Sequence, residues 1–154
     1  MSQMNFIKLI LCLLLFSVVI YAQDKDFGLG IMLGEPTAIS GKYWTSSTNA
    51  WDFGLGYSFV NAENKTSIHA DYLYHIPNFI KAKYRIPFYY GFGFRLRFHS
   101  NESSNIGARG VTGLAMLLDE IPLDIFFELA PVFSLFPKTS LNLDAAIGAR
   151  YFFK

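Results

Sequence analysis

Large apolar side chains alternate with small or charged ones along residues 88–98. Phe88, Tyr90, Phe92, Phe94, Leu96 and Phe98 form one set, and Tyr89, Gly91, Gly93, Arg95 and Arg97 form the other. Successive side chains of a β-strand point to opposite faces, so the segment predicts a strand with an aromatic face and a glycine- and arginine-rich face. Such a pattern is typical of a strand that turns one face to hydrocarbon and the other to a narrow polar lumen.

Similar patterning recurs along the chain, and polar or breaker-rich connections such as Gly34-Glu35-Pro36 separate the segments. The predicted strands are 26–33, 37–44, 50–60, 66–75, 86–98, 106–117, 121–134 and 140–153. Their even spacing predicts one all-β meander. Residues 75–85 are ambiguous, because Asn78 to Tyr84 fits either a helical turn or a loop. Pro131 cannot donate to a ladder, so it predicts a bulge or an early strand end in the seventh segment.

One face of these segments is large and apolar. It carries Trp51, Phe53, Leu55, Tyr57, Phe59, Ile68, Tyr72, Tyr74, Leu123, Ile125, Phe127, Leu129, Leu143, Ile147, Tyr151 and Phe153. The opposite face is small or ionised. It carries Ser40, Lys42, Asp52, Gly54, Gly56, Ser58, His69, Asp71, Arg109, Asp124, Glu128, Asn142, Asp144, Gly148 and Arg150. In the sixth segment Gly107, Gly110, Thr112 and Gly113 blur the alternation.

Two kinds of barrel fit this pattern, and they differ in which face points inward. A soluble lipocalin-type barrel turns its apolar residues inward around a ligand. Glycines such as Gly54 and Gly91 lie on the ionised face, however, as expected if that face is the crowded interior. Placing basic residues on a lipid face would cost ~2–4 kcal/mol each. We therefore predict an eight-stranded antiparallel up-and-down transmembrane β-barrel with a polar, side-chain-filled lumen.

The N-terminus and the composition agree with an exported protein. The chain has 154 residues, of which 52% are hydrophobic and 16% charged. Lys8 precedes an apolar run from Leu9 to Tyr21, and Ala22 is a small residue suited to cleavage before Gln23, as is typical of a secretory signal peptide. We therefore expect residues 1–22 to be cleaved and residues 23–154 to form the barrel domain. Cleavage would remove the only cysteine, Cys12, and leave 12 basic and 12 acidic residues. This zero net charge gives no indication of a nucleic-acid partner.

Several short stretches carry a family resemblance. They are Gly34-Glu35-Pro36-Thr37 leading into Ser40-Gly41-Lys42-Tyr43-Trp44, His69-Ala70-Asp71-Tyr72, Tyr89-Tyr90-Gly91 leading to Arg95-Leu96-Arg97-Phe98, and Gly148-Ala149-Arg150-Tyr151-Phe152-Phe153. With these, the chain resembles the small eight-stranded outer-membrane barrels of the OmpX and OmpA transmembrane-domain type. It is also similar to uncharacterised bacterial surface barrels with a Gly-Glu-Pro-Thr turn. The resemblance implies periplasmic termini and recognition of the last strand by the barrel-assembly machinery.

An eight-stranded barrel has room inside only for side chains. The inward face supplies equal numbers of bases and acids, and we expect them to close the lumen as an ionic network of Lys42, Asp52, Asp71, Arg95, Arg97, Arg109, Asp124, Glu128, Asp144 and Arg150. Aromatic residues should form a girdle at the periplasmic membrane interface. The candidates are Tyr43, Trp44, Trp51, Tyr74, Phe88, Tyr151 and Phe153.

Catalytic and metal chemistry find little support in the sequence. The three histidines, His69, His75 and His99, lie on different segments without metal-ligand spacing, so we predict no metal and no cofactor. A few small barrels act on lipids with serine, histidine and a carboxylate. Here the corresponding candidates are His99 with Ser100, Ser103 or Ser104 and Glu102. Adjacent residues on a strand point apart, however, so we predict that the protein is not an enzyme.

The sequence therefore predicts an integral protein of a bacterial outer membrane with a structural or surface-interaction role. Its expected partners are outer-membrane lipid, the barrel-assembly machinery during biogenesis, and envelope or host surface molecules. Three alternatives stay open: a small-solute channel, a lipid-modifying outer-membrane enzyme, and a soluble lipocalin-like ligand carrier.

Overall fold

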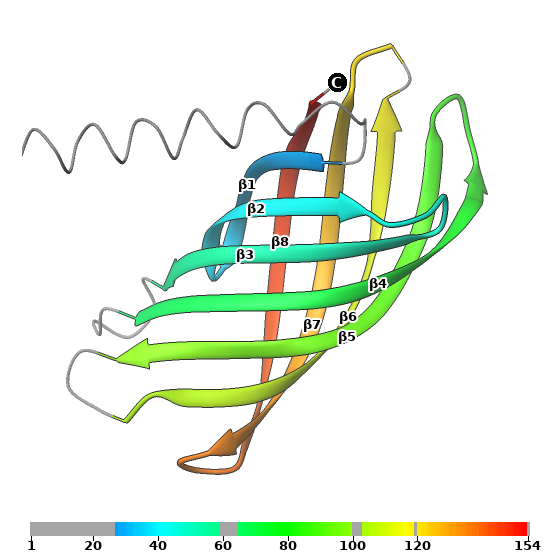
Figure 1. The fold of residues 1–154 in the computed structure, drawn as a ribbon. Helices are drawn as coiled ribbons and strands as arrows, with labels where there is room; N and C mark the ends of the chain where they lie inside the picture. The colour runs from blue at the N-terminus through cyan, green and yellow to red at the C-terminus, as the bar shows by residue number, and fades with distance from the viewer. Residues whose placement is uncertain (1–26, 59–64, 100–102, 119, 154) are drawn as a thin grey trace, which may run out of the picture.

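The strands of this protein follow one another around a closed wall (Figure 1). The computed structural model describes residues 27–58, 65–99, 103–118 and 120–153. Within these ranges eight strands are present. They are β1 (Phe27–Glu35), β2 (Thr37–Trp44), β3 (Asn49–Ser58), β4 (Lys65–Lys81), β5 (Arg85–His99), β6 (Asn105–Leu118), β7 (Leu123–Phe136) and β8 (Ser140–Phe153). The expected signal peptide, residues 1–22, lies outside the described residues.

Each strand pairs antiparallel with the next, and β8 closes the barrel by pairing with β1. At the closure Gly30 of β1 lies opposite both Ser40 of β2 and Arg150 of β8. The predicted fold, an all-β, eight-stranded, antiparallel up-and-down barrel, is confirmed. No helix in the described part of the chain is long and apolar enough to cross a membrane.

Residues 75–81 are part of a strand. β4 continues to Lys81, six residues beyond the predicted end, so this part of the ambiguous segment is strand. The β4–β5 register shifts between Ile76 and Ile80, where Asn78 adopts a φ of 53°. Asparagine tolerates this left-handed conformation better than most residues, which allows the irregularity without ending the strand.

Pro131 does not produce the predicted bulge or strand end. It pairs in register with Leu143 of β8, and β7 runs on to Phe136. Towards β6 the pairs Arg109–Val132 and Thr112–Leu129 keep the same alignment on either side of the proline. The missing N–H therefore interrupts the ladder towards β6 locally without inserting a residue. The register shift between β6 and β7 instead falls between Ile106 and Gly107.

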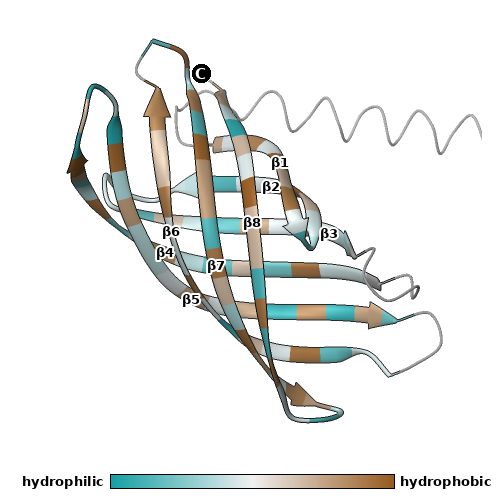
Figure 2. Ribbon diagram, turned by 180° about the vertical axis from the view of Figure 1, so that it is seen from behind, coloured by the Kyte–Doolittle hydropathy of each residue, from teal (hydrophilic) through white to brown (hydrophobic). Residues whose placement is uncertain are grey.

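The two faces of the wall differ as the alternation predicts. Figure 2 shows hydrophobic and hydrophilic residues alternating along the strands. Large apolar side chains on every strand are exposed on the outside, among them Phe92 at 64% and Leu143 at 67%. Nine of the ten ionised residues predicted for the lumen are buried, and Arg97 is half-buried. Inward glycines allow the strands and their side chains to crowd together, since a Cβ on Gly93 would lie 2.0 Å from the carbonyl oxygen of Ala70.

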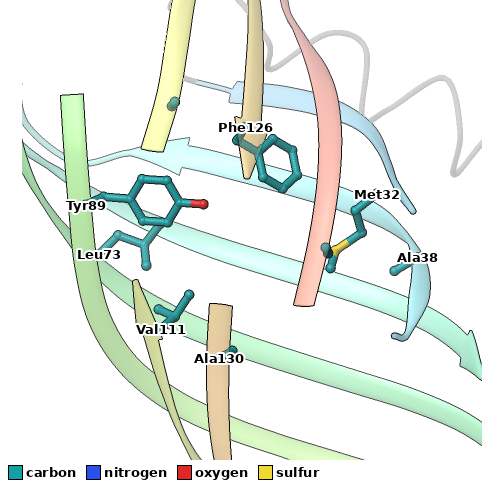
Figure 3. Close-up of a cluster of buried hydrophobic side chains, with 9 residues drawn as sticks. Met32, Ala38, Leu73, Tyr89, Val111, Phe126 and Ala130 are labelled. Carbon is teal, nitrogen blue, oxygen red and sulfur yellow. The ribbon is translucent and has the colours of Figure 1, made fainter. Parts of the chain in front are cut away.

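The interior also contains an apolar cluster that the sequence does not predict. Figure 3 shows its labelled side chains inside the barrel, contributed by strands from opposite walls. The cluster consists of Met32, Ala38, Leu73, Tyr89, Val111, Ala115, Phe126, Ala130 and Ala146. Burial of Val111 and Ala115 together with Arg109 fixes the facing of β6, so that Gly107 and Gly113 point inward and Gly110 and Thr112 outward.

Candidate functional site in the barrel lumen

Arg109 is the hub of a group of ionised side chains midway along the lumen. Its guanidinium uses three nitrogens to reach carboxylates on three strands. Nε donates to Asp71 Oδ2 of β4 at 2.9 Å, Nη1 to Asp144 Oδ2 of β8 at 3.3 Å, and Nη2 to Glu128 Oε1 of β7. All four side chains are buried. The planar fork of arginine suits this role because its donors diverge in fixed directions.

A second arginine shares one of these carboxylates. Arg95 of β5 donates from Nη1 to the same Asp144 Oδ2 that Arg109 reaches. On the other side of the hub, the Tyr89 hydroxyl donates to Glu128 Oε2 at 3.3 Å. We call Asp71, Arg95, Arg109, Glu128 and Asp144 the central cluster. Its two guanidinium groups and three carboxylates connect the five consecutive strands β4 to β8 by charge-assisted hydrogen bonds.

A second group lies nearer the end of the barrel where β1 begins and β8 ends, which we call the terminal end. Arg150 donates from Nε to Ser40 Oγ and from Nη2 to Asp52 Oδ2, each at 2.8 Å. Its Nη1 lies 3.5 Å from Asp124 Oδ2. The guanidinium also sits 3.8 Å from the ring centroid of Phe126, close enough for a cation–π contact.

Lys42 completes this terminal cluster of Lys42, Asp52, Asp124 and Arg150. Its Nζ lies 3.9 Å from Asp124 Oδ2 and 2.9 Å from Nε2 of His75. The histidine ring is fixed from its other side, since Nδ1 lies 3.1 Å from the carbonyl oxygen of Thr48. Because Lys42 can only donate, this geometry assigns Nε2 as the acceptor and Nδ1 as the donor to that carbonyl.

The predicted network therefore divides into groups. Nine of the ten residues are buried in the two clusters. Arg97 is separate: it lies at the opposite end of the barrel, which we call the distal end, and its Nη2 is 3.5 Å from Oε1 of Glu35. The sequence did not single out Glu35, because strict alternation places it on the outer face of β1.

Trp44 differs from the other predicted girdle residues. Its ring lies 4.3 Å from the ring of His75, and Lys42 Nζ lies 4.5 Å from its centroid. Trp44 therefore lies on the inner face, as does Lys42 two positions before it in β2. It does not join the outward aromatic residues. This corrects the prediction, which had followed residue type rather than the parity of β2.

The remaining girdle candidates lie on the outer face near the terminal end. They are Tyr43, Trp51, Tyr74, Phe88, Tyr151 and Phe153, and all but the partly buried Phe88 are exposed. Ring contacts extend this surface across neighbouring strands: Trp51 packs edge-on against Tyr72 at 5.0 Å, and Tyr74 stacks on Tyr90 at 5.7 Å. The aromatic residues thus form a continuous outward band over β3, β4 and β5.

The sequence analysis missed the lumen contacts of three residues. His75 had a usable signal, because it continues the inward series of His69 and Asp71. Tyr89 was assigned to the inner face, but its bond to Glu128 could not be read from one strand. Glu35 had no such signal.

The lumen side chains that the structure describes hold charge in place through mutual ion pairs and hydrogen bonds. Within the described ranges no group of three or more His, Cys, Asp or Glu side chains could hold a metal ion. The sequence candidates for lipid chemistry, His99 with Ser100, Ser103 or Ser104 and Glu102, fall partly on residues 100–102, which lie outside the described residues. The chemistry that the structure does display is mutual neutralisation of buried ions.

No family model matches the chain, and no curated protein matches it in sequence. Among solved structures, it is similar to the N-terminal β-barrel domain of Pseudomonas aeruginosa OprF, with 13% identity and a TM-score of 0.56 over 83% of this chain and 96% of that one. It is also similar to Neisserial surface protein A (NspA), with 15% identity and a TM-score of 0.55 over 83% of this chain and 94% of that one. The chain thus has the fold of the small eight-stranded outer-membrane β-barrels, as its sequence resemblance predicted.

Proposed function

We propose that this protein is an integral outer-membrane barrel with a structural or surface-interaction role, whose lumen is closed by the central and terminal clusters. One observation carries the proposal: the outside of the wall is apolar on all strands, while the ionised side chains of the central and terminal clusters are buried inside. Exposing this outer surface to water would be unfavourable, and soluble monomers rarely expose contiguous apolar patches above a few hundred Å².

A membrane location agrees with the pairing of the wall. Every strand has two hydrogen-bonded neighbours, so the barrel has no free edge strand that would leave a whole ladder unpaired in hydrocarbon. The outward aromatic band near the terminal end would lie at one interface, as such girdles do in this class. Export through the N-terminal segment and insertion by the barrel-assembly machinery complete the proposal, with outer-membrane lipid as the permanent partner.

A closed lumen favours this role over a small-solute channel. Arg109 contacts acids on three strands, and Tyr89, Phe126 and Leu73 are packed at 1% exposure or less inside the wall. Opening a path would require separating buried ion pairs, which costs several kcal/mol for each uncompensated charge. The protein would therefore act through its wall and its exposed turns rather than by transport.

The other two alternatives have less support. A soluble ligand carrier needs an apolar interior and a polar exterior, and this barrel has the reverse. Enzymatic activity would need a nucleophile and a base held within hydrogen-bond reach. The two similar solved structures are a β-barrel domain of OprF and a Neisserial surface protein. We therefore propose a non-enzymatic barrel.

Fractionation of cells expressing the full chain tests the proposal. We expect the protein in the outer-membrane fraction, extractable only with detergent, and migrating faster on gels before boiling than after. Recovery in the soluble fraction without detergent would contradict a membrane barrel. Planar-bilayer recording on the same purified material tests the closed lumen, since regular conductance steps would replace the structural role with a channel.

A further inference from the structure

Three polar residues lie side by side on the inner face at the distal end. Ser67 of β4 pairs with Arg97 of β5, and Arg97 pairs with Asn105 of β6. Residues directly opposite on neighbouring strands have Cβ atoms about 4.5–5.5 Å apart, so the three side chains share one small region. Arg95, two residues before Arg97 on the same face, borders the row on the side of the central cluster.

This row contains buried donors without hydrogen-bond partners. Ser67 is fully buried, and its hydroxyl has no partner in the described part of the protein. The same holds for Nε of Arg95, whose side chain is 2% exposed, and for Nε and Nη2 of Arg97. An unpaired buried polar group costs about 1–3 kcal/mol, and more when it is charged. Unpartnered buried atoms also occur elsewhere in the lumen, and Asn105 Oδ1 is an unpartnered acceptor in this row. The unused donors of Ser67, Arg95 and Arg97 are nevertheless close enough together to serve the oxygens of one bound group.

Glu35 reaches these donors from another part of the wall. β1 carries Glu35 and neighbours β2 and β8, whereas Arg97 lies on β5. The turn bends into the barrel: Pro36 is buried, and a Cβ on the inward Gly56 would lie 3.0 Å from its ring. Oε1 of Glu35 stops 3.5 Å from Arg97 Nη2. An arginine fork can hold a carboxylate through two parallel bonds of about 2.7–2.9 Å. The longer contact with Glu35 therefore uses little of the hydrogen-bonding capacity of Arg97.

We propose that Arg97, Ser67 and Arg95 form a binding site for one small oxyanion, a phosphate or carboxylate group, and that Glu35 covers the site as an internal carboxylate. The guanidinium of Arg97 would present its fork to two oxygens, and the Ser67 hydroxyl would donate to a third. Arg95 adds positive charge and offers its Nε, because only its Nη1 is bound to Asp144. Entry of the external anion displaces the Glu35 carboxylate and moves the turn at Pro36 away from the lumen.

The ligand could be a free anion or the headgroup of a lipid, and the outer surface bears on this choice. An apolar groove of about 460 Å³ lies on the outside of the wall, where Ile31, Leu33, Ile39, Leu55 and Tyr57 line it. Thr37, two residues after Glu35, also lines this groove, so the groove and the turn are adjacent. An acyl chain in the groove would place its headgroup beside the short β1–β2 turn.

Titration of the purified, folded protein with inorganic phosphate tests the site. The measurement uses isothermal calorimetry in a maltoside detergent and a phosphate-free buffer, so it does not depend on the membrane role proposed above. Relative to the unchanged protein, Glu35→Gln should bind phosphate at least tenfold more tightly, because the competing carboxylate is gone. Arg97→Gln should bind at least tenfold more weakly. Lys138→Gln, which removes an exposed cation from the β7–β8 turn, should stay within twofold.

Two further variants distinguish a loss of binding from a folding defect. Arg97→Lys keeps the charge but loses the fork, and it should weaken binding less than Arg97→Gln while retaining the heat-dependent gel shift. Ser67→Ala removes only the hydroxyl and should weaken binding severalfold. Equal binding by all variants, or equal weakening by Lys138→Gln and Arg97→Gln, would overturn the site in favour of nonspecific charge attraction. Absence of phosphate binding even by Glu35→Gln would also overturn it.

A second arm identifies the source of the anion. Phosphatidic acid is added to the maltoside micelles, with phosphatidylcholine as the control lipid. If phosphatidic acid binds at least tenfold more tightly than inorganic phosphate and the gain depends on Arg97, the ligand is a lipid headgroup. If the two bind equally and both depend on Arg97, the site takes a free anion. Binding of phosphatidic acid that is unaffected by Arg97→Gln, together with no binding of inorganic phosphate, would overturn the proposal.

Discussion

Arg109 and Asp71 join across the barrel interior, from β6 to β4, through a 2.9 Å hydrogen bond between Nε and Oδ2. The strand between them, β5, contributes Gly93 at this level, and Gly93 pairs with both Asp71 and Arg109. A side chain at that position would separate the two ions. The ion pair therefore depends on a glycine that makes no polar contact of its own.

Replacing Arg109 tests the hub. In Arg109→Met the three carboxylates of Asp71, Glu128 and Asp144 lose their shared partner, and we expect the free energy of unfolding to fall by about 3–5 kcal/mol. Urea unfolding in lipid vesicles, followed by tryptophan fluorescence, measures the change. Lys81→Gln, at an exposed position near the end of β4, should change it by less than about 0.5 kcal/mol. Equal effects of the two variants would show that the hub contributes nothing specific.

Gly93 should be sensitive for a steric reason. A Cβ there would lie 2.0 Å from the carbonyl oxygen of Ala70 and 2.4 Å from Oδ1 of Asp71. We expect Gly93→Ala to destabilise the barrel by about 1–3 kcal/mol, as overpacking generally does. Gly110→Ala is the matched control, because its Cβ would come no nearer than 3.6 Å to Pro131. The same urea titration compares them, and a Gly110 variant as unstable as the Gly93 variant would contradict the crowding at the inner face.

Arg150 and Asp52 should behave as a coupled pair. Their 2.8 Å bond is buried, so either single change, Arg150→Met or Asp52→Leu, leaves one uncompensated ion. We expect the double variant to be more stable than the sum of the single losses implies, with a coupling free energy of about 1–3 kcal/mol. A double-mutant cycle measured by urea unfolding gives this quantity. Strict additivity would mean that the two side chains do not interact in solution.

Charge introduced on the outer face should report membrane depth. Phe92 lies in the middle of β5 and Phe136 at the end of β7, and both are more than 60% exposed. In phospholipid vesicles we expect Phe92→Arg to cost about 2–4 kcal/mol of unfolding free energy and Phe136→Arg about 0–1. Similar small costs at both positions would indicate that water, rather than hydrocarbon, surrounds the middle of the wall.

The pattern of the sequence was sufficient for the barrel and for the facing of most strands. Alternation alone placed Arg95 and Arg109 inside and Phe92 outside, because a one-residue shift would exchange the faces of the whole strand. Alternation also places Trp44 inside, but its prediction followed residue type instead. Apart from Arg109, the facing of β6 stayed open, because Gly107, Gly110, Thr112 and Gly113 blur its alternation.

The ion pairs could not be predicted one by one. Which acid meets Arg109 depends on the stagger between strands and on contacts across the lumen, and neither is encoded in the period of a single strand. Asp144 illustrates this, since it serves both Arg95 and Arg109 from a strand that adjoins neither β5 nor β6. The Glu35 contact was inaccessible for another reason: the turn at Pro36 folds inward, against the parity of β1.

The two tryptophans of the protein, Trp44 and Trp51, provide the most direct test of the orientation of the wall. Trp44 packs on His75 inside the barrel, whereas Trp51 is 39% exposed on the outer aromatic band. The single-tryptophan variants Trp44→Phe and Trp51→Phe are refolded into vesicles with and without brominated acyl chains, and the ratio of fluorescence intensities is measured. An apolar exterior in lipid and an ionic interior require strong quenching of Trp51 and weak quenching of Trp44. Equal quenching of both, or stronger quenching of Trp44, would contradict this orientation.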